Sequence, residues 1–116
     1  MDIRSAIQQW VTNFNAADVN ALADMYHDTA INHQLPNDAV EGKENIRAMF
    51  GKEFAAADMT CIVENIFVDG DWGILEWKDP KGLRGCGFFQ FKNEKIILQR
   101  GYWDKLSFLK MHEMEG

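Results

Sequence analysis

One carboxylate near the end of the sequence lies among large aromatic side chains, a combination that can support proton transfer. Asp104 directly follows Tyr102 and Trp103, and Arg100 lies just upstream as a counter-charge. A carboxylate held in an aromatic pocket has a raised pKa and can act as a general base near neutral pH. The same aspartate at the end of a strand can instead cap the helix that follows. The sequence leaves both interpretations of Asp104 open.

A histidine on a short strand is the second candidate for acid–base chemistry. The segment from Thr29 to Leu35 alternates in polarity with the period of a strand, and His33 shares one face with Ile31 and Leu35. Because that face is the more apolar one, we expect His33 to point inward. A titratable ring in a cavity can donate a proton or orient a substrate.

A second carboxylate is expected at the mouth of the same cavity. Asp79 shares a strand face with Leu75 and Trp77, and this face is bulkier and more apolar than the one that carries Glu76. A β-bulge would reverse the two faces and bring Glu76 inward instead. The candidate catalytic residues are Asp104, His33 and Asp79, and the candidate substrate-binding residues are Tyr102, Trp77, Ile31, Arg100, Trp10 and Phe14.

Three helices are predicted ahead of the main sheet. Apolar residues recur at helical spacing from Ile3 to Phe14. Asp18 is a favourable N-cap for a second, shorter helix, whose expected buried side is Val19, Leu22, Ala23, Met25 and Tyr26. A third helix is predicted after Gly42, and Glu53 is expected to lie largely outside its apolar stripe. The stripe consists of Ile46, Met49, Phe50, Phe54 and Ala57.

Four consecutive strands are predicted between Met59 and Asp104, joined by short turns such as Asp69-Gly70-Asp71. Gly85 and Gly87 remove side-chain bulk inside the third of these strands, which indicates a bend or an open space. A short helix is expected after Asp104. The order predicts an α+β fold, a cone-shaped roll in which three N-terminal helices pack on a curved antiparallel sheet and enclose a pocket.

Composition and charge narrow the classes of partner. The 116 residues fit one domain, residues 1–116, and the formal net charge of −6 argues against binding to nucleic acid or to an anionic membrane surface. No apolar run approaches the roughly 20 residues needed to span a bilayer. The N-terminal segment lacks the pattern of a secretory signal, so we expect a cytoplasmic protein. Cys61 and Cys86 lack metal-binding spacing, so no metal site is predicted.

The order of elements resembles the SnoaL-like domains of the nuclear-transport-factor-2-like superfamily over nearly the whole chain. The motifs that carry the resemblance are Phe14-Asn-Ala-Ala-Asp18, Asp28-Thr-Ala-Ile-Asn-His33, Gly42-Lys-Glu-Asn-Ile46, Phe88-Phe-Gln-Phe91, and Lys95-Ile96 leading to Tyr102-Trp-Asp104. This superfamily includes ketosteroid isomerases, polyketide cyclases, limonene-epoxide hydrolases and members without known activity. The resemblance implies a cavity for a small apolar molecule and chemistry that uses no organic cofactor.

Two patterns within the superfamily imply roles for individual residues. Tyr102-Trp103-Asp104 is similar to the end of the last strand in limonene-epoxide hydrolases, where the aspartate activates water. The tyrosine and asparagine that position this water fall on Ile31 and His33, and the Arg-x-Asp pair falls on 77–79, so the tyrosine and arginine are not retained. In polyketide cyclases an aspartate works as acid and base beside a histidine, roles that Asp104 and His33 would take.

Two hypotheses about function follow. In the first, the protein is an isomerase, cyclase or hydrolase that converts a small apolar molecule by acid–base chemistry without a cofactor, with Asp104 as base and His33 as acid or orienting partner. In the second, it is a non-catalytic ligand-binding or dimerisation domain in which Asp104 is structural. A homodimer is expected from the resemblance and from aromatic residues on the sheet such as Phe88 and Trp103.

Overall fold

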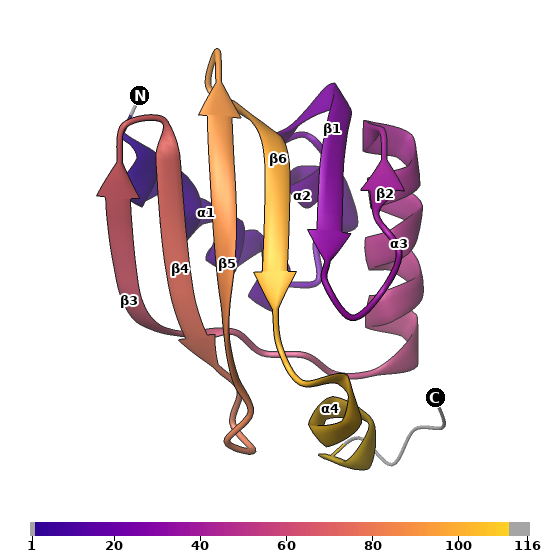
Figure 1. Cartoon of the computed structure of the whole chain (residues 1–116). Coiled ribbons are helices and arrows are strands. Elements are labelled where there is room, and N and C mark those ends of the chain that lie inside the picture. The colour runs from indigo at the N-terminus through magenta and orange to yellow at the C-terminus, as the bar shows by residue number, and fades with distance from the viewer. Residues whose placement is uncertain (1, 112–116) are drawn as a thin grey trace.

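The computed structural model describes residues 2–111, which form four helices and one six-stranded sheet (Figure 1). The helices are α1 (Ile3–Asn15), α2 (Val19–Ala23), α3 (Lys43–Ala56) and α4 (Lys105–Met111). The strands are β1 (Tyr26–Gln34), β2 (Val40–Glu41), β3 (Ile62–Asp69), β4 (Trp72–Lys78), β5 (Arg84–Lys92) and β6 (Lys95–Tyr102).

The sheet is mixed and open, with strand order β2-β1-β6-β5-β4-β3. Strands β3 to β6 form the expected antiparallel meander, and β1 then pairs in parallel with β6. The prediction of a purely antiparallel sheet is therefore wrong at this one pair. The parallel pairing has a structural consequence, because it brings a strand from the N-terminal half beside the last strand, where both can contribute to one site.

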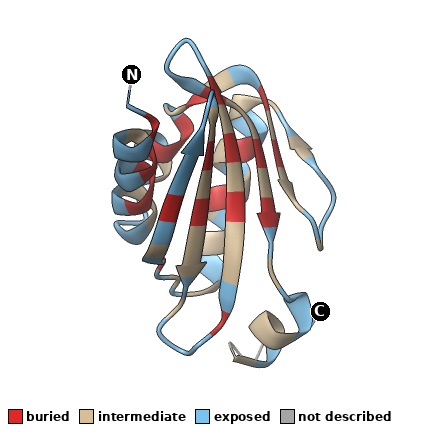
Figure 2. Cartoon of the chain, turned by 60° about the vertical axis from the view of Figure 1, so that its left-hand side comes forward, coloured by how far each residue is buried: buried red, intermediate tan, exposed pale blue. Residues whose placement is uncertain are grey.

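Helices α1, α2 and α3 cover one face of the curved sheet, and α4 lies at its lower end (Figure 1). The first helix follows its predicted apolar stripe and buries Ile3, Ile7, Trp10 and Val11. It packs closely on β4, because a Cβ atom at Gly73 would collide with the side chain of Ile7. Figure 2 shows that the buried residues lie along the inner layer between helices and sheet, whereas β3 is mostly exposed. Loss of contacts in this layer would separate α1 from the meander.

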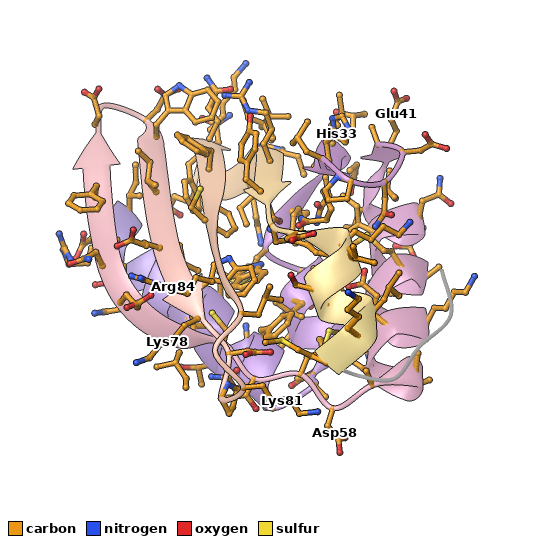
Figure 3. The ribbon with its side chains drawn as sticks, turned by 60° about the horizontal axis from the view of Figure 1, so that its bottom comes forward. His33, Glu41, Asp58, Lys78, Lys81 and Arg84 are labelled. Carbon is orange, nitrogen blue, oxygen red and sulfur yellow. The ribbon has the colours of Figure 1, made fainter. Side chains whose placement is uncertain are left out.

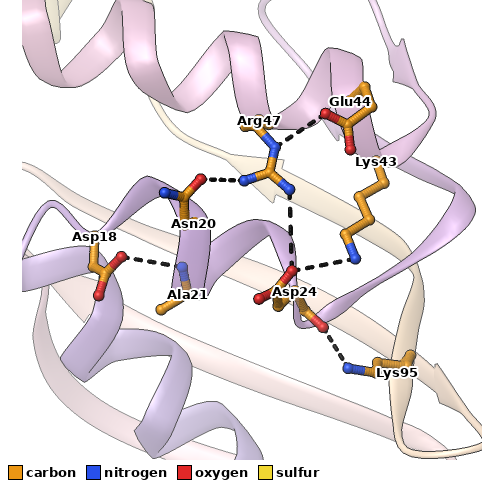
Figure 4. Close-up of polar contacts among 8 residues, drawn as sticks. All are labelled: Asp18, Asn20, Ala21, Asp24, Lys43, Glu44, Arg47 and Lys95. Atoms are coloured by element: carbon orange, nitrogen blue, oxygen red, sulfur yellow. Dashed lines mark hydrogen bonds and ion pairs between the residues drawn. The ribbon is translucent and has the colours of Figure 1, made fainter.

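Polar contacts hold α2 against α3 and β6 (Figure 4). Asp18 caps α2 as predicted, since its carboxylate accepts a hydrogen bond from the backbone N–H of Ala21 at 3.1 Å. Asp24, at the end of α2, lies 3.3 Å from the ammonium of Lys43 and 4.0 Å from the guanidinium of Arg47. The ammonium of Lys95 donates to the backbone carbonyl of Asp24. These contacts fix the corner where the helices meet the sheet.

Two local expectations are confirmed and one is corrected. Gly70 has a φ of +60° in the turn between β3 and β4, a conformation that favours glycine. The C-terminal helix forms as α4. Tyr26, however, belongs to β1, because α2 ends at Ala23. No helix within residues 2–111 combines the length and apolar character needed to cross a membrane.

Candidate functional site

A cavity of about 400 Å³ lies between the helices and the concave face of the sheet. Its wall is mostly apolar and includes aromatic rings from α1, α3, β4 and β5, such as Trp10, Phe50, Trp77 and Phe89. Gly87 and Gly101 belong to the lining, so the sheet presents backbone instead of side chains at these points. The volume is at the small end of the range for ligand pockets, which is roughly 300–1,000 Å³.

A chain of hydrogen-bonded polar side chains crosses this apolar wall. The indole N–H of Trp10 donates to the hydroxyl of Tyr26 at 3.0 Å, and that hydroxyl donates to Oε1 of Gln99. The amide of Asn32 also donates to Oε1 of Gln99, at 3.1 Å. Asn32 and Gln99 are the two polar residues classed as buried in the described core, with exposures of 0% and 4%.

The chain continues from Asn32 to the C-terminal end of the sheet. Nε2 of Gln34 donates to Oδ1 of Asn32 at 2.7 Å, and Oε1 of Gln34 accepts a hydrogen bond from the indole N–H of Trp103 at 2.9 Å. Gly101 permits this arrangement, because a Cβ atom there would collide with the Gln34 amide. We call the six residues Trp10, Tyr26, Gln99, Asn32, Gln34 and Trp103 the amide relay.

Glu53 is a carboxyl in the cavity wall whose pKa lies well above its ordinary value. Burial raises the pKa of Glu53 to about 7. Within residues 2–111 its carboxyl has no hydrogen-bond or ion-pair partner. Burial also raises the pKa of Tyr26, and the charge of nearby Glu53 adds to that shift. A carboxyl that is half-buried and has no partner to stabilise its charge can take up or release a proton near neutral pH.

Four of the sequence-predicted site residues lie in the cavity wall. Trp10 and Phe14 stack with ring centroids 5.1 Å apart, and Trp77 and Asp79 reach the cavity from β4 and the turn that follows it. Of the two carboxylates considered for the cavity, Asp79 belongs to its wall and Glu76 does not. The Glu76 carboxylate instead accepts a hydrogen bond from the side-chain amide of Asn65 at 2.7 Å. The Asp79 carboxylate accepts hydrogen bonds from the backbone N–H groups of Lys81 and Leu83, both at 2.9 Å, so it also orders its own turn.

The predicted inward face of β1 is reversed. Asn32 and Gln34 line the cavity, whereas Ile31 and His33 alternate with them and are not part of its wall. The ring of His33 instead lies 3.1 Å from the backbone carbonyl of Asn37. In Figure 3, His33 appears near Glu41, at the opposite edge of the view from Asp58 and Lys81. The expectation that His33 shares a cavity with the carboxylates is therefore wrong.

Arg100 and Tyr102 also lie outside the cavity, on the outer face of the sheet. The guanidinium of Arg100 is 5.1 Å from the centre of the Trp72 ring and 5.9 Å from that of Phe88. Tyr102 packs edge-on against Phe88 and is 42% exposed. These contacts correct the expectation that both residues bind a substrate in the cavity.

Asp104 caps α4. Its carboxylate accepts hydrogen bonds from the backbone N–H of Leu106 at 3.0 Å and from the hydroxyl of Ser107 at 2.8 Å. These hydrogen bonds, with that to Ser107 foremost, hold the pKa of Asp104 below its usual value. The expectation of a raised pKa is wrong, because Asp104 is exposed to solvent. Its contacts are those of a helix cap, the second of the two interpretations given above.

The sequence contained signals for some of the site residues that were missed. Glu53 follows Ile46 by seven positions and Phe50 by three, so it belongs to the apolar stripe of α3 that was read without it. Asn32 and Gln34 share one parity on β1, opposite to that of His33. Gln99 gave no signal of its own. Across residues 2–111, no cluster of three His, Cys, Asp or Glu side chains could hold a metal ion.

The structure belongs to the class of cone-like α+β folds, in which helices and a curved sheet surround a mostly apolar cavity with a few polar groups in its wall. Residues 7–99 match the model of the SnoaL-like domain, and the chain belongs to this family. No curated protein matches the chain by sequence.

Solved structures show the same fold at low sequence identity. An NTF2-like protein of unknown function from Cytophaga hutchinsonii superposes with a TM-score of 0.81 at 14% identity, covering 94% of this chain and 96% of that one. SalBIII, an epoxide hydrolase/cyclase-like enzyme described in pyran ring formation in polyether salinomycin, gives 0.79 at 18% identity over 89% and 91%. A SnoaL-like protein of unknown function from Burkholderia thailandensis gives 0.79 at 15% identity over 87% and 93%.

Proposed function

We propose that the protein binds a small apolar molecule in the cavity and that the carboxyl of Glu53 transfers a proton to or from it. The observation that carries this proposal is the position of Glu53, a half-buried carboxyl without a partner among the described residues, in a mostly apolar wall. With a pKa of about 7, both the acid and the carboxylate are populated at neutral pH.

This step is common to the isomerase, cyclase and hydrolase chemistry found among proteins of this fold. A carboxylate removes a proton from carbon or from water, and the acid returns a proton to oxygen or carbon, so no organic cofactor is needed for the transfer. Family membership supports the proposal, and so does the fold shared with SalBIII, although the fold by itself does not define a reaction.

The proposal changes which residues are assigned to the chemistry. Asp104 and His33 are left out, because the first caps α4 and the second lies on the far side of β1 from the cavity. Asp79 remains at the cavity wall as a second carboxylate that can influence the charge at the mouth. Trp10, Phe14 and Trp77 supply apolar contact area for the bound molecule.

Hydrogen–deuterium exchange of a ketone tests proton transfer without knowledge of the natural substrate. 1-Tetralone is a small apolar probe whose exchange next to the carbonyl can be followed by proton NMR in D₂O between pH 6 and 8. We expect the protein to accelerate this exchange with a pH dependence centred near 7. Glu53→Gln should reduce the acceleration by roughly 100-fold or more, since a positioned acid–base group contributes about 10²–10⁴.

Asp104→Asn is the matched control, because asparagine keeps a capping oxygen and the aspartate lies outside the cavity wall. This variant should exchange 1-tetralone at the wild-type rate. An equal loss in both variants would contradict the assignment to Glu53. Binding of 1-tetralone without any exchange would support the second hypothesis, a non-catalytic ligand-binding domain.

A further inference from the structure

The amide relay has a fixed direction of hydrogen bonding. An indole N–H can only donate, so the oxygen of any side chain that Trp10 or Trp103 contacts must accept. The two indoles stand at the two ends of the relay. An amide in the middle of such a chain cannot be flipped without placing two donors or two acceptors against each other.

The direction can be followed residue by residue from Trp103. Its N–H requires the oxygen of Gln34 to accept, which leaves the Gln34 nitrogen to donate to the oxygen of Asn32. The nitrogen of Asn32 must then donate to Oε1 of Gln99. At the other end, the indole N–H of Trp10 donates to the Tyr26 hydroxyl oxygen. The Tyr26 hydroxyl in turn donates its own proton to the same Oε1 of Gln99.

Both branches therefore end on one oxygen, and the amide nitrogen of Gln99 is left over. Within residues 2–111 this nitrogen has no hydrogen-bond partner. Nor is it sealed inside the protein, because in the described part of the chain the only fully covered side-chain nitrogen or oxygen without a partner is Nε of Arg100. Gln99 is 4% exposed and belongs to the cavity wall, so its free N–H groups meet the cavity.

We propose that the Gln99 amide is a fixed hydrogen-bond donor that selects apolar ligands carrying an acceptor oxygen, such as ketones and lactones. Gln34, Asn32, Tyr26 and the two indoles are positioning residues that hold its N–H groups toward the cavity. The inference rests on the proposed function only in that the same cavity is taken as the ligand site. It names the class of ligand and adds a residue to which no chemical role was assigned.

The selection follows from how unpaired donors behave in apolar surroundings. A ligand oxygen placed against Gln99 replaces the hydrogen bond that the amide would make to water, whereas a hydrocarbon of the same shape displaces water and leaves the N–H unpaired. Sites built around such a donor discriminate strongly against analogues that lack the acceptor. For a single neutral donor we expect a preference of roughly tenfold.

The test compares 1-tetralone with tetralin, a pair in which a carbonyl replaces a methylene group. Dissociation constants are measured by titrating ¹⁵N-labelled protein and following its amide signals. We expect 1-tetralone to bind about tenfold more tightly than tetralin, and the side-chain amide signals of Gln99 to shift with 1-tetralone only.

Variants separate the hydrogen bond from cavity contact. Gln99→Met keeps the shape and removes the donor, so the ratio of the two dissociation constants should fall to about one. Because this variant also leaves Tyr26 and Asn32 without their acceptor and can fail to fold, Trp103→Phe is the second variant. It removes one of the two donors that fix the relay, and it should lower the ratio while the protein stays folded.

Trp77→Phe is the matched control, since Trp77 also lines the cavity and its indole is not part of the relay. It should change both affinities and leave their ratio as in the wild type. Equal binding of both probes to the wild-type protein would overturn the role of Gln99 and leave the proposed function intact. Binding of neither probe would overturn the cavity as the site for apolar molecules, and with it both proposals.

Discussion

At the scale of single residues, the most informative group is a carboxyl whose burial is not compensated. Glu53 lies in an apolar wall and has a pKa of about 7, whereas Asp104 lies in solvent with a lowered pKa. The sequence drew attention to Asp104 because aromatic residues precede it. Those aromatic side chains do not surround Asp104. Tyr102 lies on the outer face of the sheet, and the indole of Trp103 donates a hydrogen bond to Gln34. Neighbours in sequence along a strand alternate between two faces and do not form one pocket.

The raised pKa of Glu53 predicts an unusual dependence of stability on pH. The ordinary value of 4.5 applies to the unfolded chain, so between pH 4.5 and about 7 only the folded protein keeps this proton. The free energy of unfolding therefore falls as pH rises through this window, by about 3 kcal/mol at most. Glu53→Gln removes the titration and should be more stable than the wild type at pH 8, and nearly equal to it at pH 4, below the ordinary pKa of 4.5.

Urea denaturation at the two pH values measures this difference. Glu41→Gln is a suitable control, because Glu41 is an exposed glutamate on β2 outside the cavity wall. It should shift stability by less than about 0.5 kcal/mol at either pH. Equal stability of the wild type and Glu53→Gln at pH 8 would show that the carboxyl finds compensation in solution.

At the scale of elements, periodicity predicted the helices and all strands but the short β2, although it did not always predict which face is buried. The stripe of α1 and the faces of β4 are as expected, because their inner residues are apolar. On β1 the inner residues include Asn32 and Gln34, and the more apolar Ile31 lies on the other side. Hydropathy predicts the wrong inner face for a strand whose inward polar side chains are hydrogen-bonded to one another, as Asn32 and Gln34 are.

The strand order shows a second limit. The meander from β3 to β6 could be predicted because its strands are joined by short turns. The parallel contact between β1 and β6 joins segments about 70 residues apart, as in the pair Asn32 and Gln99. No local pattern encodes such a pair. The amide relay depends on it, which explains why Gln99 could not be found from the sequence.

The cap of α4 gives a prediction for this element. Asp104→Ala removes the acceptor for the N–H of Leu106, so amide hydrogen exchange across α4 should become faster. Asp104→Asn should keep the protection at neutral pH. Because hydrogen bonds lower the pKa of Asp104, its stabilising effect is present at neutral pH and weakens as pH falls below the ordinary range of aspartate. Unchanged exchange in Asp104→Ala would mean that α4 is held by packing alone.

At the scale of the whole molecule, the sheet has two different faces. The inner face carries the cavity, and the outer face carries a row in which Phe67, Ile74, Phe88 and Arg100 lie on adjacent strands. Phe67 is 53% exposed, and Arg100 has a covered Nε without a partner in the described chain. Aromatic residues and arginine are the types enriched at protein interfaces.

We propose that this outer face joins two copies of the chain. Arg100 and the acidic Glu76 are both on it, so under a two-fold axis the arginine of one copy can approach the glutamate of the other. A stable contact of this kind needs about 800 Å² from each partner.

Sedimentation at micromolar concentration tests the dimer. The wild-type protein should sediment as a dimer, and Phe67→Glu and Phe88→Glu should weaken association by about 2 kcal/mol or more, because each buries a charge in an apolar contact. Leu106→Glu is the matched control, since Leu106 is 61% exposed but lies on α4, outside the row. A wild-type monomer, or equal weakening by all three substitutions, would exclude the outer face as the interface.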